Sequence, residues 1–349
     1  MPQDFQTILA AHAARYPEMA PQDYVKLAYQ SEFGPAHLLP KGEECLQALQ
    51  AEWAALPRDA APVPPEDIGG GLCRLHLEGL AEEALPLVAA LFRLTAEAQR
   101  GSREGLEEKL SLLEGLPVPG MGALLEEYRR QGCPPVHHSP AFRGAYRPHY
   151  RLLDRFYAGA LPALVLLSRL SQGPAPALAA IDGRCGSGKT SLSALARQLL
   201  VCNVVHMDDY CLPLSRRAAD WLSIPGGNMD LSRVWEEVLL PARRGGSLRC
   251  RAYDCSSGTL GPAAELPPRP LTILEGSYSL HPLLTGQYDL RIFLTCPPAV
   301  QADRLRRREG EGFGAFQARW IPLEERYLRR FSPDCRADLV RDTARWFEI

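Results

Sequence analysis

The sequence has no long apolar run and no paired-cysteine motif. Its most apolar stretch, residues 161–170, is too short to span a bilayer and contains Pro162 and Arg169. The ten cysteines are scattered, with neither a C-x-x-C pair nor the spacing of zinc ligands. The length gives ample apolar core without disulfide staples. We therefore expect reduced thiols in a cytoplasmic protein, and no structural zinc site.

An excess of charge of one sign is also missing. The chain has 39 Lys and Arg against 41 Asp and Glu, a formal net charge of −2 at pH 7. This balance creates no global field that would attract nucleic acid or a membrane surface. The opening residues 1–4 lack the basic and apolar regions of a signal peptide. These features favour an intracellular enzyme without a nucleic-acid or membrane partner, and they leave a homo-oligomer open.

The strongest positive signal is a glycine-rich motif. Residues 183–190 read GRCGSGKT, which fits the phosphate-loop pattern G-x-x-x-x-G-K-[ST] without a mismatch. An apolar run at 177–181 predicts a buried strand before it, and the spacing over 191–200 predicts a helix after it. Backbone N–H groups and a helix N-terminus then surround a phosphate. The predicted binding residues are Gly183, Cys185, Gly186, Ser187, Gly188, Lys189, Thr190 and Ser191.

Two side chains of this motif have a specific chemistry. Lys189 can reach the β- and γ-phosphates of ATP, and the Thr190 hydroxyl can ligate Mg²⁺. The alternative, an ordinary glycine-rich turn, gives no reason for a lysine and a threonine at its end.

The pattern of the chain changes near residue 173. Residues 172–176, QGPAP, form a short Gly/Pro linker. Before it, the apolar spacing is mostly helical, with a long helix expected over 152–170. After it, short apolar runs alternate with helical segments, which is typical of a parallel sheet with helices on both faces. We predict a mostly α-helical domain of unknown role over 1–172 and an α/β P-loop domain over 177–349.

Acidic residues follow two of the predicted strands, where the ligands of parallel sheets bind. Asp208 and Asp209 follow the strand 204–207, and either can be the general base for an attacking hydroxyl or a partner of Mg²⁺. Two acids capping a turn are the alternative. Glu275 ends the strand 271–275. We predict Thr190, Asp208 and Glu275 as the magnesium residues, with Asp208 as the better candidate for the base.

An arginine-rich segment with several glycines spans residues 302–330. Arginines stabilise charge on a transferring phosphoryl group, and glycines allow a lid to close over it. Arg304 and Arg308 are the candidates for this catalytic contact. A solvated helix face is the alternative.

The ordered set of motifs resembles the uridine kinase and phosphoribulokinase group, which includes one class of pantothenate kinases. The matches are IDG at 181–183, MDDY at 207–210, NMD at 228–230, RAYD at 251–254, LEG at 274–276 and DLRIFL at 289–294. The resemblance covers the C-terminal half of the chain. It implies transfer of the ATP γ-phosphate to a hydroxyl of a small molecule, with Asp208 as base and with Lys189 and Thr190 as phosphate and Mg²⁺ ligands.

The resemblance also implies an acceptor site formed by Asp208, Tyr210, Asp230 and Tyr253. Asp230 falls where uridine kinases hold the ribose hydroxyls, and Tyr253 falls in the strand that lines their base pocket. Uridine kinases carry a histidine shortly after that tyrosine, whereas YDCSSG at 253–258 has none. The acceptor can therefore be a nucleoside, a sugar, a vitamin precursor or another polyol, because hydrogen bonds in its pocket set specificity.

Two polar and aromatic stretches in the N-terminal half belong to none of these motifs. They read YQSEFGPAH at 29–37 and HHSPAFRGAYRPHYR at 137–151. The second stretch packs His, Tyr and Arg side chains together, and such a cluster can bind an anion, a nucleotide or single-stranded nucleic acid. It can equally form a hydrogen-bonded buttress between domains. A metal site built from Glu32, His37, His138 and His149 has no fixed spacing to support it.

Two functions remain for the whole chain. The first is a small-molecule kinase whose N-terminal domain is structural, oligomerising or substrate-gating. The second is an ATP-binding regulatory switch whose N-terminal domain binds a partner or ligand. The candidate base Asp208 and the acceptor pair Asp230 and Tyr253 favour the kinase, because the two classes share the phosphate loop and differ in the acceptor site.

Overall fold

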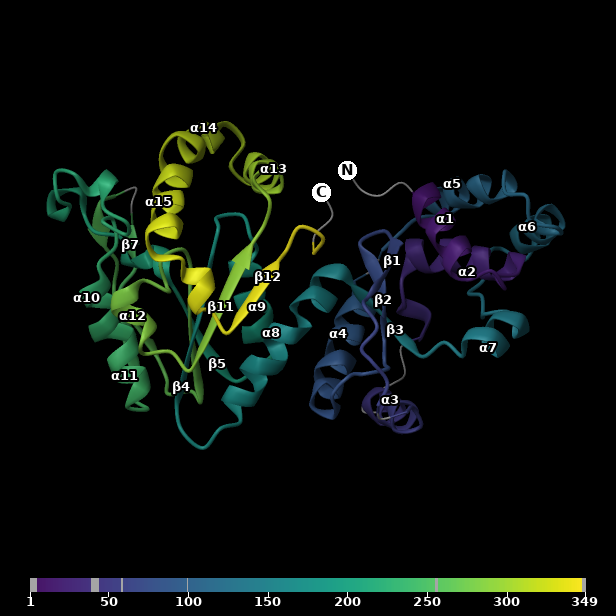
Figure 1. Ribbon diagram of the computed structural model, residues 1–349, viewed down its shortest axis with the longest axis horizontal. Helices are drawn as coiled ribbons and strands as arrows, with labels where there is room; N and C mark the ends of the chain where they lie inside the picture. Colours follow the sequence, from purple (N-terminus) through teal and green to yellow (C-terminus); the bar gives the residue numbers. More distant parts are fainter. Residues whose placement is uncertain (1–4, 39–43, 58, 99, 255–256, 347–349) are drawn as a thin grey trace. The chain divides into compact units, whose positions relative to one another are not determined.

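The computed structural model describes residues 5–346 except 39–43, 58, 99 and 255–256. The chain forms two compact units (Figure 1). The N-terminal unit contains the residues up to Leu161 together with Trp346, and the C-terminal unit runs from Pro162 to Arg345. The division therefore falls inside one helix, α8 (Arg155–Ser171), ahead of the Gly/Pro linker at 172–176.

The N-terminal unit is mostly helical, as predicted, but it also contains a small antiparallel sheet in the order β1-β2-β3. Its strands are β1 (Glu66–Gly69), β2 (Leu72–His76) and β3 (Tyr150–Asp154). Its helices are α1 (Phe5–Arg15), α2 (Pro21–Phe33), α3 (Glu44–Ala54), α4 (Leu85–Glu97), α5 (Arg103–Glu114), α6 (Met121–Arg130) and α7 (Pro140–Tyr146). The expected helix over 152–170 was placed too early, because residues 150–154 form β3 and α8 begins at Arg155.

The sheet of the N-terminal unit has one face that changes character along its strands. On this face Ile68, Leu72 and Leu152 pack into the apolar core formed with α1 and α2. The strand register places Arg74 between Glu66 and Leu152, and it pairs His76 with Tyr150 at the end of β2. Apolar and charged residues therefore meet on this face, and its polar end is the pair of His76 and Tyr150.

The C-terminal unit is built on a five-stranded parallel sheet in the order β12-β11-β4-β10-β5. Its strands are β4 (Ala177–Gly183), β5 (Cys202–His206), β10 (Leu271–Glu275), β11 (Leu290–Thr295) and β12 (Leu339–Asp342). Its helices include α9 (Lys189–Leu199), α10 (Leu231–Val234), α11 (Leu240–Arg243), α12 (Pro282–Thr285), α13 (Pro298–Glu309), α14 (Phe313–Ala315) and α15 (Ile321–Phe331). The predicted α/β P-loop architecture is confirmed.

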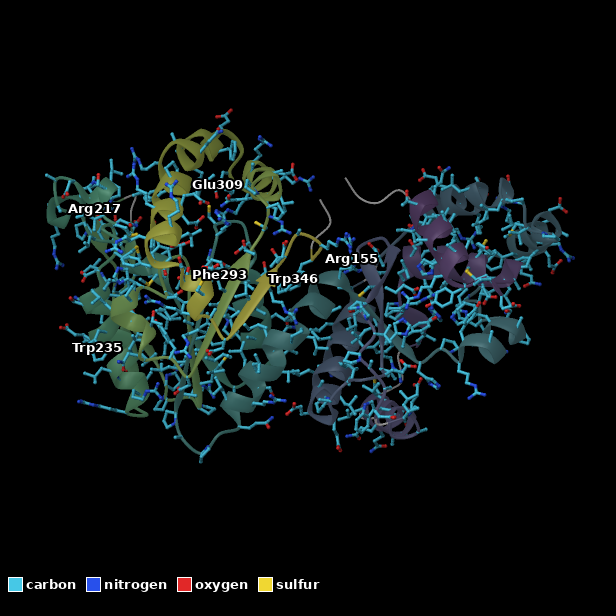
Figure 2. The ribbon with its side chains drawn as sticks, in the orientation of Figure 1. Arg155, Arg217, Trp235, Phe293, Glu309 and Trp346 are labelled. Carbon is cyan, nitrogen blue, oxygen red and sulfur yellow. The ribbon has the colours of Figure 1, made fainter. Side chains whose placement is uncertain are left out.

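Helices lie on both sides of this sheet (Figure 1). Helix α9 packs on β4, β5 and β10. Leu178 and Ala180 of β4 share a core cluster with Val234 of α10 and with Val238, which belongs to the helical segment that joins α10 to α11. Figure 2 labels Phe293 of β11, a buried member of the same cluster. Strands covered on both faces are continuous apolar runs, which explains why the sequence revealed β10 and β11 residue for residue.

Two short hairpins lie outside the main sheet. Strands β6 (Leu248–Cys250) and β9 (Ala264–Leu266) pair antiparallel, and so do β7 (Tyr253–Asp254) and β8 (Thr259–Leu260). The strand expected over 248–253 is thus divided between two hairpins. Among the described residues, no helix has the combined length and apolarity needed to cross a bilayer. The cysteines that the structure describes are all free thiols.

Gly183 ends β4 where the chain passes very close to β11. Its φ is +143°, and a Cβ at this position would lie 1.9 Å from the carbonyl oxygen of Leu294. We expect Gly183→Ala to lower the free energy of unfolding by about 2–4 kcal/mol, because backbone must move to relieve the clash.

Gly286→Ala is the matched control. Its φ is −67°, and a Cβ there meets nothing within 4 Å. Its stability should stay within about 1 kcal/mol of the parent protein. Urea unfolding of the two variants measures the difference, and equal stabilities would contradict the close approach of β4 to β11.

Candidate phosphate-binding site

The glycine-rich loop joins β4 to α9 and presents unpaired backbone N–H groups. Helix α9 begins at Lys189, directly after Gly188, whose φ of +94° is left-handed. Within the described residues, the N–H groups of Gly186 and Gly188 have no hydrogen-bond partner. The first turn of a helix also leaves its own N–H groups open, and its field favours an anion. The predicted strand, loop and helix therefore form a site for a phosphate.

The side chain of Lys189 is buried against this loop. Its Nζ donates to the carbonyl oxygens of Gly183 at 2.8 Å and Arg184 at 3.0 Å, and it lies 3.4 Å from the Ser277 hydroxyl. All of these partners are neutral. The Ser187 hydroxyl is also buried in the loop, with no partner among the described residues. A buried ammonium and an unpaired hydroxyl both fit a phosphate group in the loop.

Thr190 and Glu275, two of the three residues predicted to hold magnesium, meet at the end of the sheet. The Thr190 hydroxyl lies 3.3 and 3.4 Å from the two carboxylate oxygens of Glu275, which is buried. Hydroxyl and carboxylate oxygens are ligands that Mg²⁺ prefers. These two residues fit a magnesium ion beside the phosphate loop.

His206 completes this group and was not singled out from the sequence. Its Nδ1 lies 2.5 Å from Glu275 Oε1. The hydrogen bond to Glu275, together with that negative charge, raises the pKa of His206, although burial opposes the shift. The only sequence signal was its position, directly before the MDDY motif at the end of β5.

Asp208 and Asp209 lie in a short 3-10 turn (Met207–Tyr210) that follows β5. Asp208 is exposed and Asp209 is half-buried. Burial raises the pKa of Asp209, and the charge of Asp208 adds to this effect, while the positive charge of His206 opposes it. Asp208 is therefore the acid that is open to an acceptor.

A second glycine with a positive φ allows the turn that carries Asp208 to lie close to the end of β10. Gly276 has a φ of +137°, and a Cβ there would lie 2.6 Å from Met207 Cβ. Glu275 and the turn that carries Asp208 therefore come from two adjacent strands whose ends approach closely.

A buried acid at the start of the loop was missed in the sequence. Asp182 is fully buried, and its oxygens accept hydrogen bonds from the backbone of Gly183, Tyr278 and Leu280 and from the Tyr327 hydroxyl. Burial raises the pKa of Asp182 to about 6, while these bonds lower it. Asp182 thus fastens the loop to the turn after β10 and to α15. Its signal was an acid at the end of an apolar run.

Glu324 of α15 was also missed, and it places a carboxylate on the loop itself. Its Oε1 accepts from the Cys185 N–H at 2.7 Å and from the Ser277 hydroxyl at 2.8 Å, while its Oε2 lies 3.2 Å from Gln301 Nε2. The side chain is 3% exposed. The carboxylate of Glu324 therefore occupies one N–H group of the loop, that of Cys185.

The two predicted phosphate-contacting arginines are placed differently from each other. Arg304 donates to the carbonyl oxygen of Gly186 at 3.1 Å and to the Thr343 hydroxyl at 2.9 Å, so it supports the loop from its carbonyl side. Arg308 is exposed, and its described contacts are Glu309 and the ring of Phe316. For Arg308, the structure shows the solvated helix face rather than a site residue.

The acceptor residues suggested by the resemblance are mostly buried. Tyr210 and Tyr253 belong to the core cluster, and the guanidinium of Arg233 covers the Tyr210 ring at 4.5 Å. Asp230 caps α10 by accepting from the Arg233 N–H at 3.2 Å, and it pairs with exposed Arg216. The two tyrosines are therefore buried in the core of this unit, and their contact with an acceptor stays a prediction.

Ser191, the last residue predicted to bind the cofactor, lies exposed in the first turn of α9. No group of three or more His, Cys, Asp or Glu side chains in the described part of the chain is arranged to hold a metal. In the N-terminal unit Glu32 pairs with Lys109, His138 with Asp23 and His149 with Glu52. The metal set considered from the sequence is therefore not assembled.

No family model and no curated protein matches the chain. Among solved structures, the chain is similar to a possible uridine kinase from Bacillus stearothermophilus, with 22% identity and a TM-score of 0.41 over 54% of this chain and 98% of that chain. It is also similar to a protein described as a fructose transport system kinase from Silicibacter sp. TM1040, with 24% identity and a TM-score of 0.41 over 52% of this chain and 98% of that one. Similarity at this level says nothing about the substrate of this chain.

Glu324→Gln removes a negative charge beside the loop and keeps an acceptor oxygen for Cys185. The carboxylate and a nucleotide phosphate compete for the same electropositive region. We therefore expect the variant to bind a fluorescent ATP analogue about 3- to 10-fold more tightly, a gain of about 1 kcal/mol. Glu309→Gln, outside the loop, should leave the affinity unchanged. Weaker binding by Glu324→Gln would show that the carboxylate supports the loop instead of competing for it.

Proposed function

We propose that the C-terminal unit is an ATP-dependent kinase that transfers the γ-phosphate to a hydroxyl of a small molecule. The observation that carries this proposal is the meeting of three parts at the carboxyl end of one parallel sheet. They are the phosphate loop, the Thr190–Glu275 pair and the exposed acid Asp208 in the turn after β5, the strand next to β10. A nucleotide-binding protein needs the first two parts, and a phosphotransferase also needs the third.

Each of these residues would have its own role in phosphoryl transfer. The open N–H groups of Gly186 and Gly188 hold phosphate oxygens, and Lys189 turns from the loop carbonyls to the transferring group. Thr190 and Glu275 would hold Mg²⁺, which neutralises phosphate charge when bound. Asp208 accepts the proton of the acceptor hydroxyl while the oxygen of that hydroxyl forms a bond to the γ-phosphorus. The bond between the γ-phosphorus and the β,γ-bridging oxygen breaks, and ADP leaves with its electrons.

The acceptor approaches from the side of Asp208, since Asp208 is exposed whereas Tyr210 and Tyr253 are buried. Asp230 sits at the edge of this region with its exposed partner Arg216. A carboxylate and a guanidinium suit an acceptor with several hydroxyls. This supports the general class of nucleosides, sugars, vitamin precursors and other polyols, and the choice among them is made by the first experiment below.

One contact favours a second candidate function. Because Glu324 of α15 occupies a loop N–H, nucleotide binding would change the position of α15. The unit would then be an ATP-binding regulatory switch that hydrolyses ATP slowly and needs no acceptor. Cytoplasmic location and self-association stay predictions under either function.

Acceptor-dependent turnover separates the two candidates. The full-length protein is mixed with Mg-ATP and panels of nucleosides, sugars, polyols and vitamin precursors, and ADP release is measured. We expect one class of acceptor to stimulate ADP release, and Lys189→Ala to abolish the stimulation because the transferring phosphate loses its cation. Nucleotide binding without stimulation by any acceptor would favour the switch.

Asp208→Asn tests the base once an acceptor is known. The amide cannot take a proton, so we expect kcat to fall by about 10²- to 10⁴-fold while ATP binding persists. Asp209→Asn is the matched control, because it removes the neighbouring carboxylate, which is half-buried, and it should keep most of the turnover. A larger loss in Asp209→Asn would transfer the role of base to Asp209.

A further inference from the structure

The N-terminal unit contains a buried polar cluster that unites the two unexplained stretches of sequence. Gln30 Nε2 lies 3.2 Å from the Tyr150 hydroxyl, and His138 Nε2 lies 2.7 Å from the same hydroxyl. Gln30 Oε1 also accepts from Arg74 Nη2 at 2.9 Å. Residues 29–37 and 137–151, which are far apart in the chain, therefore meet at the polar end of the small sheet.

The acid of this cluster is fully used by its neighbours. Asp23 accepts from the Ala20 N–H at 3.0 Å, from His138 Nδ1 at 2.9 Å, and from the N–H and hydroxyl of Ser139 at 3.0 and 2.5 Å. These bonds hold Asp23 ionised and lower its pKa, although burial opposes them. No lone pair of this carboxylate is left for another cation.

Lys26 lies one turn further along α2 and is not paired with an acid. It is 7% exposed, and its one described partner is the carbonyl oxygen of Val136, 2.9 Å from Nζ. An ammonium has three donors, so two of them have no partner among the described residues. A buried charge in this state is costly, and a second partner of opposite charge would compensate it.

Arg74 and the carboxylate of Asp23 are the charges that act on Lys26. Burial, and then the charge of Arg74, lower the pKa of Lys26 to about 8, while the charge of Asp23 opposes the shift. Burial also lowers the pKa of His138 to about 4, against its hydrogen bond to Asp23 and with the charges of Arg74 and Lys26 acting in the same direction as burial. Burial, and then the charges of Lys26 and His137, lower the pKa of His37, whose ring is exposed. Arg74 is itself satisfied by Glu66 and Gln30.

We propose that the N-terminal unit binds a small molecule through an oxyanion, a carboxylate or a phosphate, with Lys26 as its anchor. His37 and His137 are exposed, and the charges of Lys26 and His137 both act on His37. The oxyanion would accept hydrogen bonds from the two donors of Lys26 that have no partner among the described residues. The resulting ion pair would offset the free-energy cost of burying the ammonium. This site is separate from the phosphate loop and does not depend on the kinase proposal.

The cluster does not suit nucleic acid. Its aromatic rings pack against one another: the His138 and Phe142 rings stack with centroids 4.1 Å apart, and Tyr16 lies 5.1 Å from Phe142. All three side chains are buried. They offer no open face for a base to stack on, and a single buried ammonium suits one oxyanion better than a phosphate backbone.

The test uses the full chain with Lys189→Ala, which removes the cation of the phosphate loop and weakens anion binding there. In the Lys189→Ala protein, inorganic phosphate and acetate are added separately, with sodium chloride at equal ionic strength as the reference. At concentrations well above Kd, we expect one of the two probes to raise the unfolding temperature by about 2–4 °C beyond chloride. Phosphate and acetate as separate arms identify which oxyanion the site takes.

Lys26→Met in the same background is the decisive variant. Methionine has a similar length and no charge, so the variant should fold and unfold at a temperature at or above that of its parent, because an unpaired buried charge is gone. The shift caused by the oxyanion should disappear. Lys109→Met, which removes a cation already paired with Glu32, should keep the shift.

A second measurement does not depend on thermal unfolding. The imidazole resonances of His37 and His137 should move on addition of the effective probe in the Lys189→Ala protein and stay fixed after Lys26→Met. The proposal is overturned if neither probe acts beyond chloride, or if the shifts survive Lys26→Met. A Lys26→Met protein that is markedly less stable than its parent would also overturn it, since the lysine would then be a structural residue.

Discussion

The carboxylate of Asp182 holds together the parts of the C-terminal unit that meet at the phosphate loop. It is fully buried at the end of the central strand β4, and it accepts hydrogen bonds from the loop, from the turn after β10 and from Tyr327 of α15. A buried carboxylate is tolerated only when its oxygens are satisfied. Its partners are therefore fixed relative to one another, and the position of Lys189, Ser277 and Glu324 around the loop follows from this constraint.

The two units use buried charge in opposite ways. In the C-terminal unit a loop built for anions receives a carboxylate, Glu324, from its own chain. In the N-terminal unit the acid Asp23 is fully bonded, and the neighbouring cation Lys26 has one neutral partner. Desolvation makes a buried charge costly in free energy in both units. The charge already present at each place therefore limits which ligands can bind there. A phosphate at the loop would have to displace the first, and an oxyanion beside Lys26 would stabilise the second.

The sequence predicted most of the C-terminal unit because its signals are local. The loop GRCGSGKT, the buried strands 271–275 and 290–295 and the acids after β5 and β10 can all be recognised from adjacent residues. The residues that were missed form hydrogen bonds with residues far away in the sequence. The Tyr327 hydroxyl donates to Asp182, and the Cys185 N–H donates to Glu324. The small sheet was missed because β2 mixes Arg74 and His76 with apolar residues, and β3 runs directly into α8. The burial of Tyr253 was not predicted, because a resemblance fixes a position along the chain and not the exposure of its side chain.

The contact between Glu324 and Cys185 also governs the chemistry of a thiol. Burial, and then the negative charge of Glu324, raise the pKa of Cys185 to about 12, so the side chain is a neutral thiol at physiological pH. Thiols react with oxidants and alkylating reagents as thiolates, and in this state the loop is protected from both. Departure of α15 from the loop would remove the carboxylate and admit water. The modification rate of this one cysteine would then report how often the loop is open.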